Sequence, residues 1–151
     1  MNIKLKLNGM PVEFDAEPNT RLLEILRTRF SMSSTKCSCL QGFCGACMVL
    51  LDDEPVTSCM IPICNVDGHE VETLEHFSRS KDSEYKRIMA AFKKANVKMC
   101  GYCDAGKIFT AYKIIKMKEA PDEKKIREMF EGQLCRCSVA DSLVEAIEKL
   151  R

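Results

Sequence analysis

The sequence has little net charge and no long apolar run, and each absence narrows the possible functions. Lysine and arginine number 23 against 22 aspartates and glutamates, and the formal net charge is +1. Without a basic block, we expect no nucleic-acid partner. No apolar run approaches membrane-spanning length, and the start, MNIKLKLNG, alternates apolar and charged residues where a secretory signal would be apolar. We therefore expect a cytoplasmic protein.

Side chains that commonly perform catalysis are also scarce. The only histidines, His69 and His76, fit no pairing with cysteine of the Rieske type, and we expect both at the surface. No Ser/His/Asp set, carboxylate pair or phosphate-binding loop stands out. The sequence thus predicts no substrate-converting residue on this chain.

Cysteine, in contrast, is abundant, with ten residues in a chain of 151. Disulfides are rare in a reducing cytoplasm, so these cysteines are better explained as thiolate ligands of a metal. Eight of them fall into two sets of four. Of the two left over, we expect Cys37 to be a loop thiol and Cys64 to be a buried apolar side chain.

Hydrophobic periodicity predicts strands in the first half of the chain. Apolar residues alternate over 3–7 and 12–14 around the turn Asn8-Gly9, and further strands are expected near 48–56 and 69–74. A helix from Leu22 to Leu26 would pack its apolar side on this sheet. Residues 1–77 are therefore predicted to form a compact α+β domain.

Residues 78–151 show helical spacing instead. Apolar residues recur at i, i+3, i+4 and i+7 within 85–92 and again within 105–112, and a shorter helix is expected over 122–131. Ser138-x-x-Asp141 resembles a capping box before a last helix. Four helices suggest a small bundle. The polar stretch FSRSKDSE at 77–84 is the expected boundary between the two domains.

The first cysteine set has the spacing of a plant-type [2Fe–2S] site. It reads Cys39-x4-Cys44-x2-Cys47, with Cys59 a further eleven residues on. A binuclear cluster needs two thiolates on each iron, so the loop must wrap around it. Glycines at 42 and 45 permit that wrapping and let backbone N–H groups approach the sulfurs. Structural zinc is the alternative, because Cys44-x2-Cys47 alone would suit a zinc knuckle, but the x4, x2 spacing favours iron–sulfur.

The second set is Cys100-x2-Cys103, followed after 31 residues by Cys135-x-Cys137. Its spacing alone suits zinc as well as iron–sulfur. Both pairs stand just before predicted helices, whose N-termini each carry roughly half a positive charge. That suits an anionic centre, and an oxidised [2Fe–2S] cluster with four thiolates carries a net charge of about −2.

Together these motifs resemble one family over nearly the whole chain. CxxGxCGAC at 39–47, CGYC at 100–103 and GQLCRC at 132–137 are similar to the iron–sulfur subunit of the molybdenum hydroxylases, the family of xanthine dehydrogenase, aldehyde oxidoreductase and carbon monoxide dehydrogenase. The resemblance implies a ferredoxin-like (β-grasp) domain followed by a four-helix-bundle domain. It also implies two [2Fe–2S] clusters, with no cofactor of another kind on this chain.

The resemblance further implies a role and ligands. Such a chain relays electrons from a molybdopterin centre on a large subunit to FAD, usually on a medium subunit, during oxidation of a purine, an N-heterocycle or an aldehyde. By resemblance, one set holds the flavin-side cluster: Cys39, Cys44, Cys47 and Cys59. The other holds the molybdenum-side cluster: Cys100, Cys103, Cys135 and Cys137.

The departures from the family pattern are concentrated around the second set. Met99 replaces the glutamine that contacts the pterin, Asp104-Ala105 replaces Thr-Pro, and Ser138-Val139-Ala140 replaces Thr-Gly-Tyr. All eight ligands remain while the pterin-facing surroundings have changed. Two alternatives therefore stay open: a zinc-binding scaffold module, and a relay whose partner carries a different cofactor.

Overall fold

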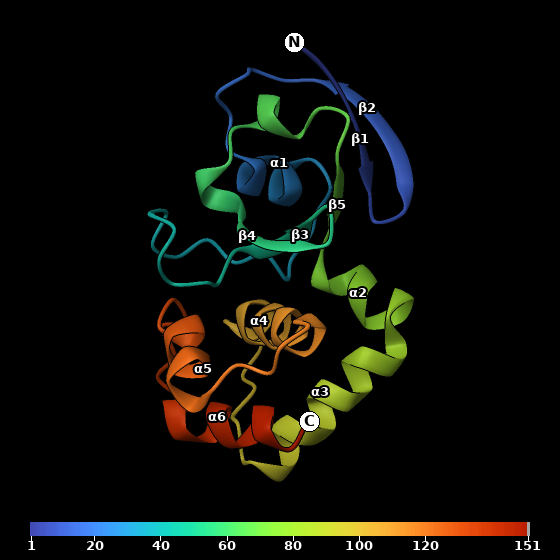
Figure 1. The fold of residues 1–151 in the computed structure, drawn as a ribbon. Helices are drawn as coiled ribbons and strands as arrows, with labels where there is room; N and C mark the ends of the chain where they lie inside the picture. The colour runs from blue at the N-terminus through green and yellow to red at the C-terminus, as the bar shows by residue number, and fades with distance from the viewer. Residues whose placement is uncertain (151) are drawn as a thin grey trace.

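The computed structural model describes residues 1–150, in which a small mixed sheet stands on a group of helices (Figure 1). The sheet has the strand order β2-β1-β5-β3-β4, with β1 and β5 parallel and the other pairs antiparallel. The strands are β1 Asn2–Leu7, β2 Met10–Asp15, β3 Met48–Leu51, β4 Glu54–Thr57 and β5 Glu70–Glu72. The predicted strands are therefore confirmed.

Two tight turns build the hairpins of this sheet. Asn8 (φ 53°) and Gly9 (φ 80°) join β1 to β2, and Asp52 (φ 48°) and Asp53 (φ 67°) join β3 to β4. Positive φ at both central positions matches the twist of the flanking strands, and asparagine, aspartate and glycine tolerate it best. The short polar sequences between the apolar runs thus set the strand register.

The helices follow the sheet in the chain, apart from α1. The α-helices are α1 Leu22–Thr28, α2 Leu74–Ser80, α3 Asp82–Lys94, α4 Asp104–Lys116, α5 Glu123–Phe130 and α6 Ala140–Glu148, with short 3-10 turns η1 Ser58–Met60 and η2 Ile63–Val66. Helices α3 to α6 are the four that the periodicity predicted, and α2 adds a fifth to this half. Within residues 1–150, none of these helices has the length and apolarity needed to cross a membrane.

The sheet is buried on both faces. Successive side chains of a strand point to opposite faces, and on β3 Val49 belongs to the core under α1 while Leu50 belongs to the core of the helical half. Helix α4 packs against β3 and β4 on this second face. The two halves of the chain therefore share one sheet, with α1 on one side of it and α4 on the other (Figure 1).

The polar stretch 77–84, the expected boundary, lies mostly in α2 and α3, with Phe77 fully buried in the helical core, and the boundary itself stays a prediction. Two local expectations need correction. The capping box was wrong: Val139 is the N-cap of α6, and the Ser138 hydroxyl bonds to the backbone of Lys98 instead. Cys64 was expected to be buried but is half-exposed, with its thiol donating to the Asn65 side chain.

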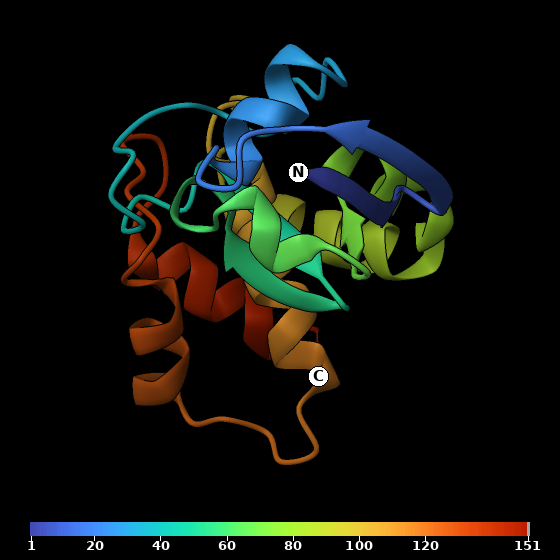
Figure 2. The same ribbon diagram turned by 90° about the horizontal axis from the view of Figure 1, so that it is seen from above.

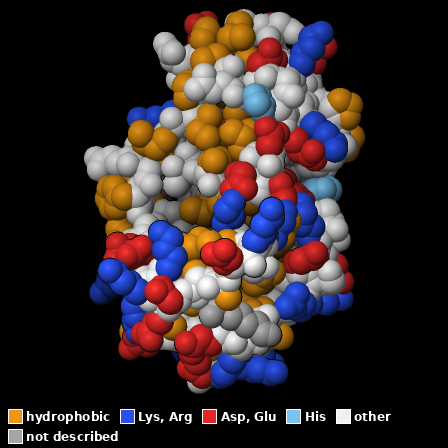
Figure 3. All heavy atoms as spheres, viewed as in Figure 1, with side chains coloured by type: hydrophobic (Ala, Val, Ile, Leu, Met, Phe, Trp, Pro, Cys, Tyr) orange, Lys and Arg blue, Asp and Glu red, His pale blue; other side chains and the backbone are white. Residues whose placement is uncertain are grey.

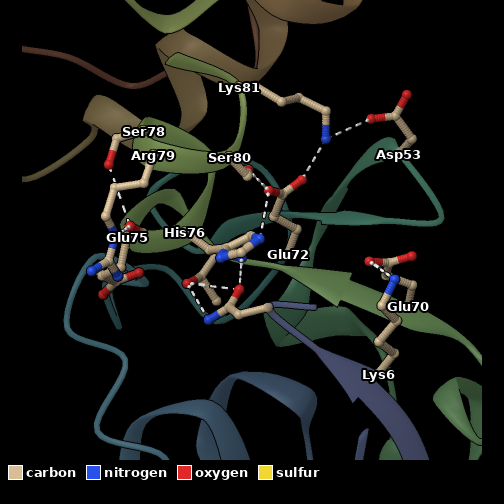
Figure 4. Close-up of polar contacts among 12 residues, drawn as sticks. Lys6, Asp53, Glu70, Glu72, Glu75, His76, Ser78, Arg79, Ser80 and Lys81 are labelled. Atoms are coloured by element: carbon tan, nitrogen blue, oxygen red, sulfur yellow. Dashed lines mark hydrogen bonds and ion pairs between the residues drawn. The ribbon is translucent and has the colours of Figure 1, made fainter. Parts of the chain in front are cut away.

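A polar network ties the sheet to the first helices (Figure 4). The buried carboxylate of Glu72 accepts hydrogen bonds from the Ser80 hydroxyl (2.5 Å) and the Lys81 ammonium (2.7 Å), and His76 lies 3.7 Å away. Lys81 also reaches Asp53 in the β3–β4 turn at 3.4 Å. A buried carboxylate is stable only when it is paired in this way, so the network fixes how the chain leaves the sheet.

Ion pairs at the surface also connect the helical half of the chain to the sheet. Lys113 and Lys116 of α4 form ion pairs with Glu54 and Asp53 of the β3–β4 hairpin. On the face shown in Figure 3, acidic and basic side chains are intermixed over the helical half. Exposed pairs of this kind each contribute on the order of 0–1 kcal/mol, so apolar packing supplies more of the contact than charge does.

Two glycines lie where the two halves of the chain pack tightly against each other. An added Cβ at Gly106 in α4 would lie 2.7 Å from the Gly45 carbonyl oxygen and would overlap the Gln133 side chain. A Cβ at Gly45 would overlap Gln133 as well. Gln133 is buried and its amide donates to the Thr110 hydroxyl at 3.2 Å. Three segments that are distant in sequence can therefore meet only because two of them have glycine at the point of contact.

We predict that Gly106→Ala destabilises the protein by about 1–3 kcal/mol, because backbone at Gly45 must move to admit the methyl group. Chemical unfolding of the anaerobically purified protein measures the change. Gly132→Ala is the matched control, since the nearest atom to its added Cβ is the Phe43 carbonyl oxygen at 3.9 Å. Equal stability of the two variants would contradict the close contact.

Candidate metal centres

The first cysteine set lies on the long loop between α1 and β3 and on the turn η1. Cys39 is partly exposed, whereas Cys44, Cys47 and Cys59 are buried. The Lys36 N–H donates to the Ala46 carbonyl at 2.9 Å, and this bond closes the loop on itself. The four predicted ligands thus come from two segments that the sheet brings together.

Glycines shape this loop as the sequence indicated. Gly42 has φ 80° and Gly45 has φ 72°, in the left-handed region that side chains disfavour. The turn around Gly42 also brings the Gln41 N–H to 3.4 Å from the Cys39 sulfur. Such N–H groups stabilise a thiolate, and they are common around cluster sulfurs.

Within the first set the cysteines meet in pairs. The side chain of Cys44 hydrogen-bonds to Cys39, and that of Cys59 hydrogen-bonds to Cys47. The Gln41 N–H, helped by Cys44, lowers the pKa of the Cys39 thiol to about 6, while burial raises the pKa of the Cys47 thiol to about 12. The apolar side chains of Leu23 and Leu40 pack around the Cys47/Cys59 pair.

The second set joins the start of α4 to the segment between α5 and α6. Cys103 is the N-cap residue of α4, so the predicted helix start is confirmed, with Asp104 as the first helical residue. The Ser138 hydroxyl accepts from the Lys98 N–H (2.8 Å) and donates to the Lys98 carbonyl (3.0 Å). This reciprocal bond holds the two cysteine segments against each other.

The second set is also paired. Cys103 hydrogen-bonds with Cys135, and Cys100 with Cys137. Burial raises the pKa of the Cys103 thiol to about 11. Burial also opposes ionisation of Cys135, but hydrogen bonds from the Cys137 N–H and the Lys107 ammonium outweigh it and lower that pKa to about 7. The contact with Cys100 raises the pKa of Cys137.

Pairing of this kind suits a binuclear cluster. In residues 1–150 no three metal-ligating side chains converge as they would on a single ion, and the cysteines meet two by two. Two thiolates on one tetrahedral metal ion lie about 3.8 Å apart for metal–sulfur bonds of about 2.3 Å, a separation close to that of hydrogen-bonded thiols. Each set therefore offers one pair to each of two irons, and the donors fit a [2Fe–2S] group.

Sequence reasoning missed Lys107, which the structure places at the second set. Its side chain is fully buried, and its ammonium donates to the Lys98 carbonyl at 2.6 Å and contacts the Cys135 sulfur. Burial opposes its charge, but the hydrogen bond to Cys135 and the nearby acidic groups outweigh that cost and raise the pKa of Lys107. No periodicity could signal this burial, because α4 is buried on nearly every side from Ala105 to Tyr112.

Asp104, singled out in the sequence, faces inward beside this set. One carboxylate oxygen accepts from the Gly101 N–H at 3.0 Å, and the other is buried without a hydrogen-bond partner in the described part of the chain. Its charge acts on both Cys103 and Lys107. The second set thus has a carboxylate and an ammonium within its immediate surroundings.

The two sets adjoin each other. The Leu134 N–H donates to the Cys44 carbonyl at 3.2 Å, and Leu134 directly precedes Cys135. The Tyr102 hydroxyl donates to the Cys37 carbonyl at 3.1 Å. The backbone at Cys37 thus joins the first cysteine loop to the segment that carries Cys100 and Cys103. Figure 2 shows the loop of the first set beside the segment between α5 and α6.

Two protein-family models match the chain, one on each half. A 2Fe-2S iron–sulfur cluster binding domain matches residues 5–74, and a second [2Fe-2S] binding domain matches residues 73–148. Each match contains one complete cysteine set. The predicted division at residues 77 and 78 stays a prediction.

Known proteins resemble the chain over almost its full length. The nicotinate dehydrogenase small FeS subunit of Eubacterium barkeri is 36% identical over 138 residues, covering 91% of this chain and 87% of its own. The xanthine dehydrogenase iron–sulfur-binding subunit of Escherichia coli O157:H7 is 34% identical, covering 97% and 92%. In the crystal structure of quinoline 2-oxidoreductase from Pseudomonas putida 86, one chain matches with a TM-score of 0.84 and 33% identity, covering 97% of this chain and 90% of that one. The predicted fold class is confirmed.

We predict that the two sites are lost independently. Cys44→Ser should remove one paramagnetic signal of the reduced protein and spare the other, and Cys135→Ser should do the reverse, because the ligand sets lie on different segments. Electron paramagnetic resonance of each variant checks this. Loss of both signals from either change, in protein that keeps its circular dichroism, would contradict two separate sites.

We predict that Asp104→Thr raises the potential of the second site and leaves the first unchanged. A nearby carboxylate disfavours adding an electron, and its removal is worth on the order of 1 kcal/mol at an effective dielectric near 20, or some tens of millivolts. A redox titration followed by paramagnetic resonance measures both sites in one sample. An unchanged or lowered potential at the second site would show that the carboxylate is screened.

Proposed function

We propose that this chain is an electron-transfer subunit. The proposal starts from its family, because the chain belongs to the two-domain [2Fe–2S] proteins that include the iron–sulfur subunits of xanthine and nicotinate dehydrogenases. It is a component of an oxidoreductase of this type. Two [2Fe–2S] clusters, when bound, supply one-electron acceptance and release. The chain itself supplies ligands, spacing and surroundings, and we assign it no catalytic residue.

The eight cysteines are the proposed ligands, two to each iron. In the first site one iron would take Cys39 and Cys44, and the other Cys47 and Cys59. In the second site the pairs are Cys100 with Cys137 and Cys103 with Cys135. This assignment follows the side-chain contacts between the cysteines and agrees with the family spacing.

The observation that most directly supports an electron relay is the backbone hydrogen bond between the two sites. The Cys44 carbonyl belongs to a first-site ligand, and the Leu134 N–H that it accepts from is one residue from the second-site ligand Cys135. Electron transfer requires donor and acceptor to be close and held rigidly. A scaffold that held two structural metals would have no need of this contact.

Exposed apolar side chains beside each site provide docking surfaces. Tyr102 (48% exposed), Leu134 (60%) and Val139 (67%) lie within two residues of second-site cysteines, while Phe43 (48%) and Met60 (56%) directly adjoin first-site ones. Apolar side chains left in water next to a functional site are typical of protein interfaces.

We therefore propose two partners in a cytoplasmic hetero-oligomer. A large molybdopterin subunit docks over the second site, and a medium FAD subunit or another acceptor docks over the first. The substrate, a purine, an N-heterocycle or an aldehyde, is oxidised on the large subunit. Because Met99 replaces the family's pterin-contacting glutamine and Val139-Ala140 change the pterin-facing surroundings, a large subunit with a different cofactor is the second candidate for that position.

Anaerobic purification of a tagged chain from its native cells tests this function. We predict a red-brown complex with about four irons and four inorganic sulfides per chain, which is what two binuclear clusters require. The complex should contain a large subunit whose released cofactor is molybdopterin. Metal analysis, sulfide assay and mass spectrometry measure these quantities on one sample.

Two outcomes would overturn parts of the proposal separately. Colourless protein with stoichiometric zinc would exclude the electron-relay function and favour the zinc-binding scaffold module. Protein that contains the expected iron but purifies alone, as a free monomer, would favour an independent ferredoxin-like electron carrier and exclude the hydroxylase complex.

A further inference from the structure

Lys107 is the one fully buried lysine among residues 1–150, and it lies against a site built of thiols. It sits in the first turn of α4, four residues after Cys103. The ammonium donates to the Lys98 carbonyl (2.6 Å) and to the Ser138 hydroxyl (3.3 Å), and it hydrogen-bonds to the Cys135 sulfur. All three of its N–H donors therefore have partners.

A buried ammonium is costly unless an opposite charge compensates it. The carbonyl and hydroxyl partners satisfy hydrogen bonds but carry no net charge. The negative groups near Lys107 are Cys103, Cys135 and Asp104. Two of these three are ligands in the proposed second site, so the charge of that site is what makes the buried lysine stable.

The lysine is also aimed at one site only. The apolar side chains of Leu23 and Leu40 pack around the Cys47/Cys59 pair, and Arg21, which lines a surface pocket with Cys59, is exposed to solvent rather than buried. The two sites thus differ by one buried positive charge. Positive charge favours the more negative, reduced form of a cluster, because reduction adds an electron to a centre that already carries about −2.

We propose that Lys107 is a positioning residue for the second site: it holds the Cys135 sulfur by a charged hydrogen bond and raises the reduction potential of the cluster bound there. Asp104 opposes it from the same turn of α4. The inference rests on the proposed function, since it requires a cluster at these cysteines.

Lys107→Met tests the charge with little change in side-chain length or volume. We expect the equilibrium constant for reduction of the second cluster to fall about tenfold, equivalent to about 59 mV for one electron, while the first cluster keeps its potential. A redox titration followed by paramagnetic resonance reads both clusters in the same purified protein. A residue that only closed the Lys98–Ser138 contact would change stability and leave the potential unaltered.

Lys113→Met is the matched control, because it makes the same substitution on the same helix at an exposed side chain paired with Glu54. We expect both potentials to stay unchanged in it. An unchanged or raised second potential in Lys107→Met, with both signals and the full iron content present, would overturn this inference alone. Absence of clusters from the unaltered protein would overturn the proposed function instead.

A measurement on the unaltered sequence keeps the test decisive if Lys107→Met fails to assemble its second cluster. Protein labelled with ¹⁵N-lysine is reduced, and its second-site signal is examined by pulsed paramagnetic resonance. We expect a ¹⁵N coupling from the ammonium hydrogen-bonded to Cys135, absent from the first-site signal. No lysine coupling at the second site would overturn the inference without any variant.

Discussion

The close packing of two backbone segments and one buried side chain is the constraint on which the rest of this structure depends. Gly45 on the first cysteine loop, Gly106 in α4 and the buried Gln133 occupy a space that no Cβ could enter. Because protein interiors are packed at crystal-like density, a methyl group at either glycine would separate the segments. Their contact brings the Cys44 carbonyl to the Leu134 N–H, and this places the two cysteine sets side by side.

The shared sheet makes this contact rigid. With Val49 directed into one core and Leu50 into the other, movement of the helices relative to the sheet would open both apolar cores at once. The Glu72 network and the α4 ion pairs then fix the angle at which the helices leave the sheet. A relay benefits from such stiffness, because electron transfer between two fixed sites needs no domain motion to bring them together.

The two sites are chemically alike and electrostatically different. Both consist of cysteine pairs with a backbone N–H on one sulfur, from Gln41 in the first site and from Cys137 in the second. The first site lies among apolar side chains, whereas the second lies beside the buried ammonium of Lys107 and the partly buried carboxylate of Asp104. A difference in surroundings of this kind is the physical means by which identical ligands can hold clusters of different potential.

The sequence by itself determined the features that depend on neighbours in the chain. The alternation around Asn8-Gly9 specified a hairpin, the x4, x2 spacing after Cys39 specified a wrapping loop, and the helical periods specified α3 to α6. Tertiary structure alone decided which cysteines pair in the second set, that Ser138 binds Lys98 rather than capping α6, and that Lys107 is buried. The reason is that periodicity and spacing record local geometry, whereas these contacts join segments roughly 30 to 40 residues apart, whose approach depends on glycines and packing that no local pattern reveals.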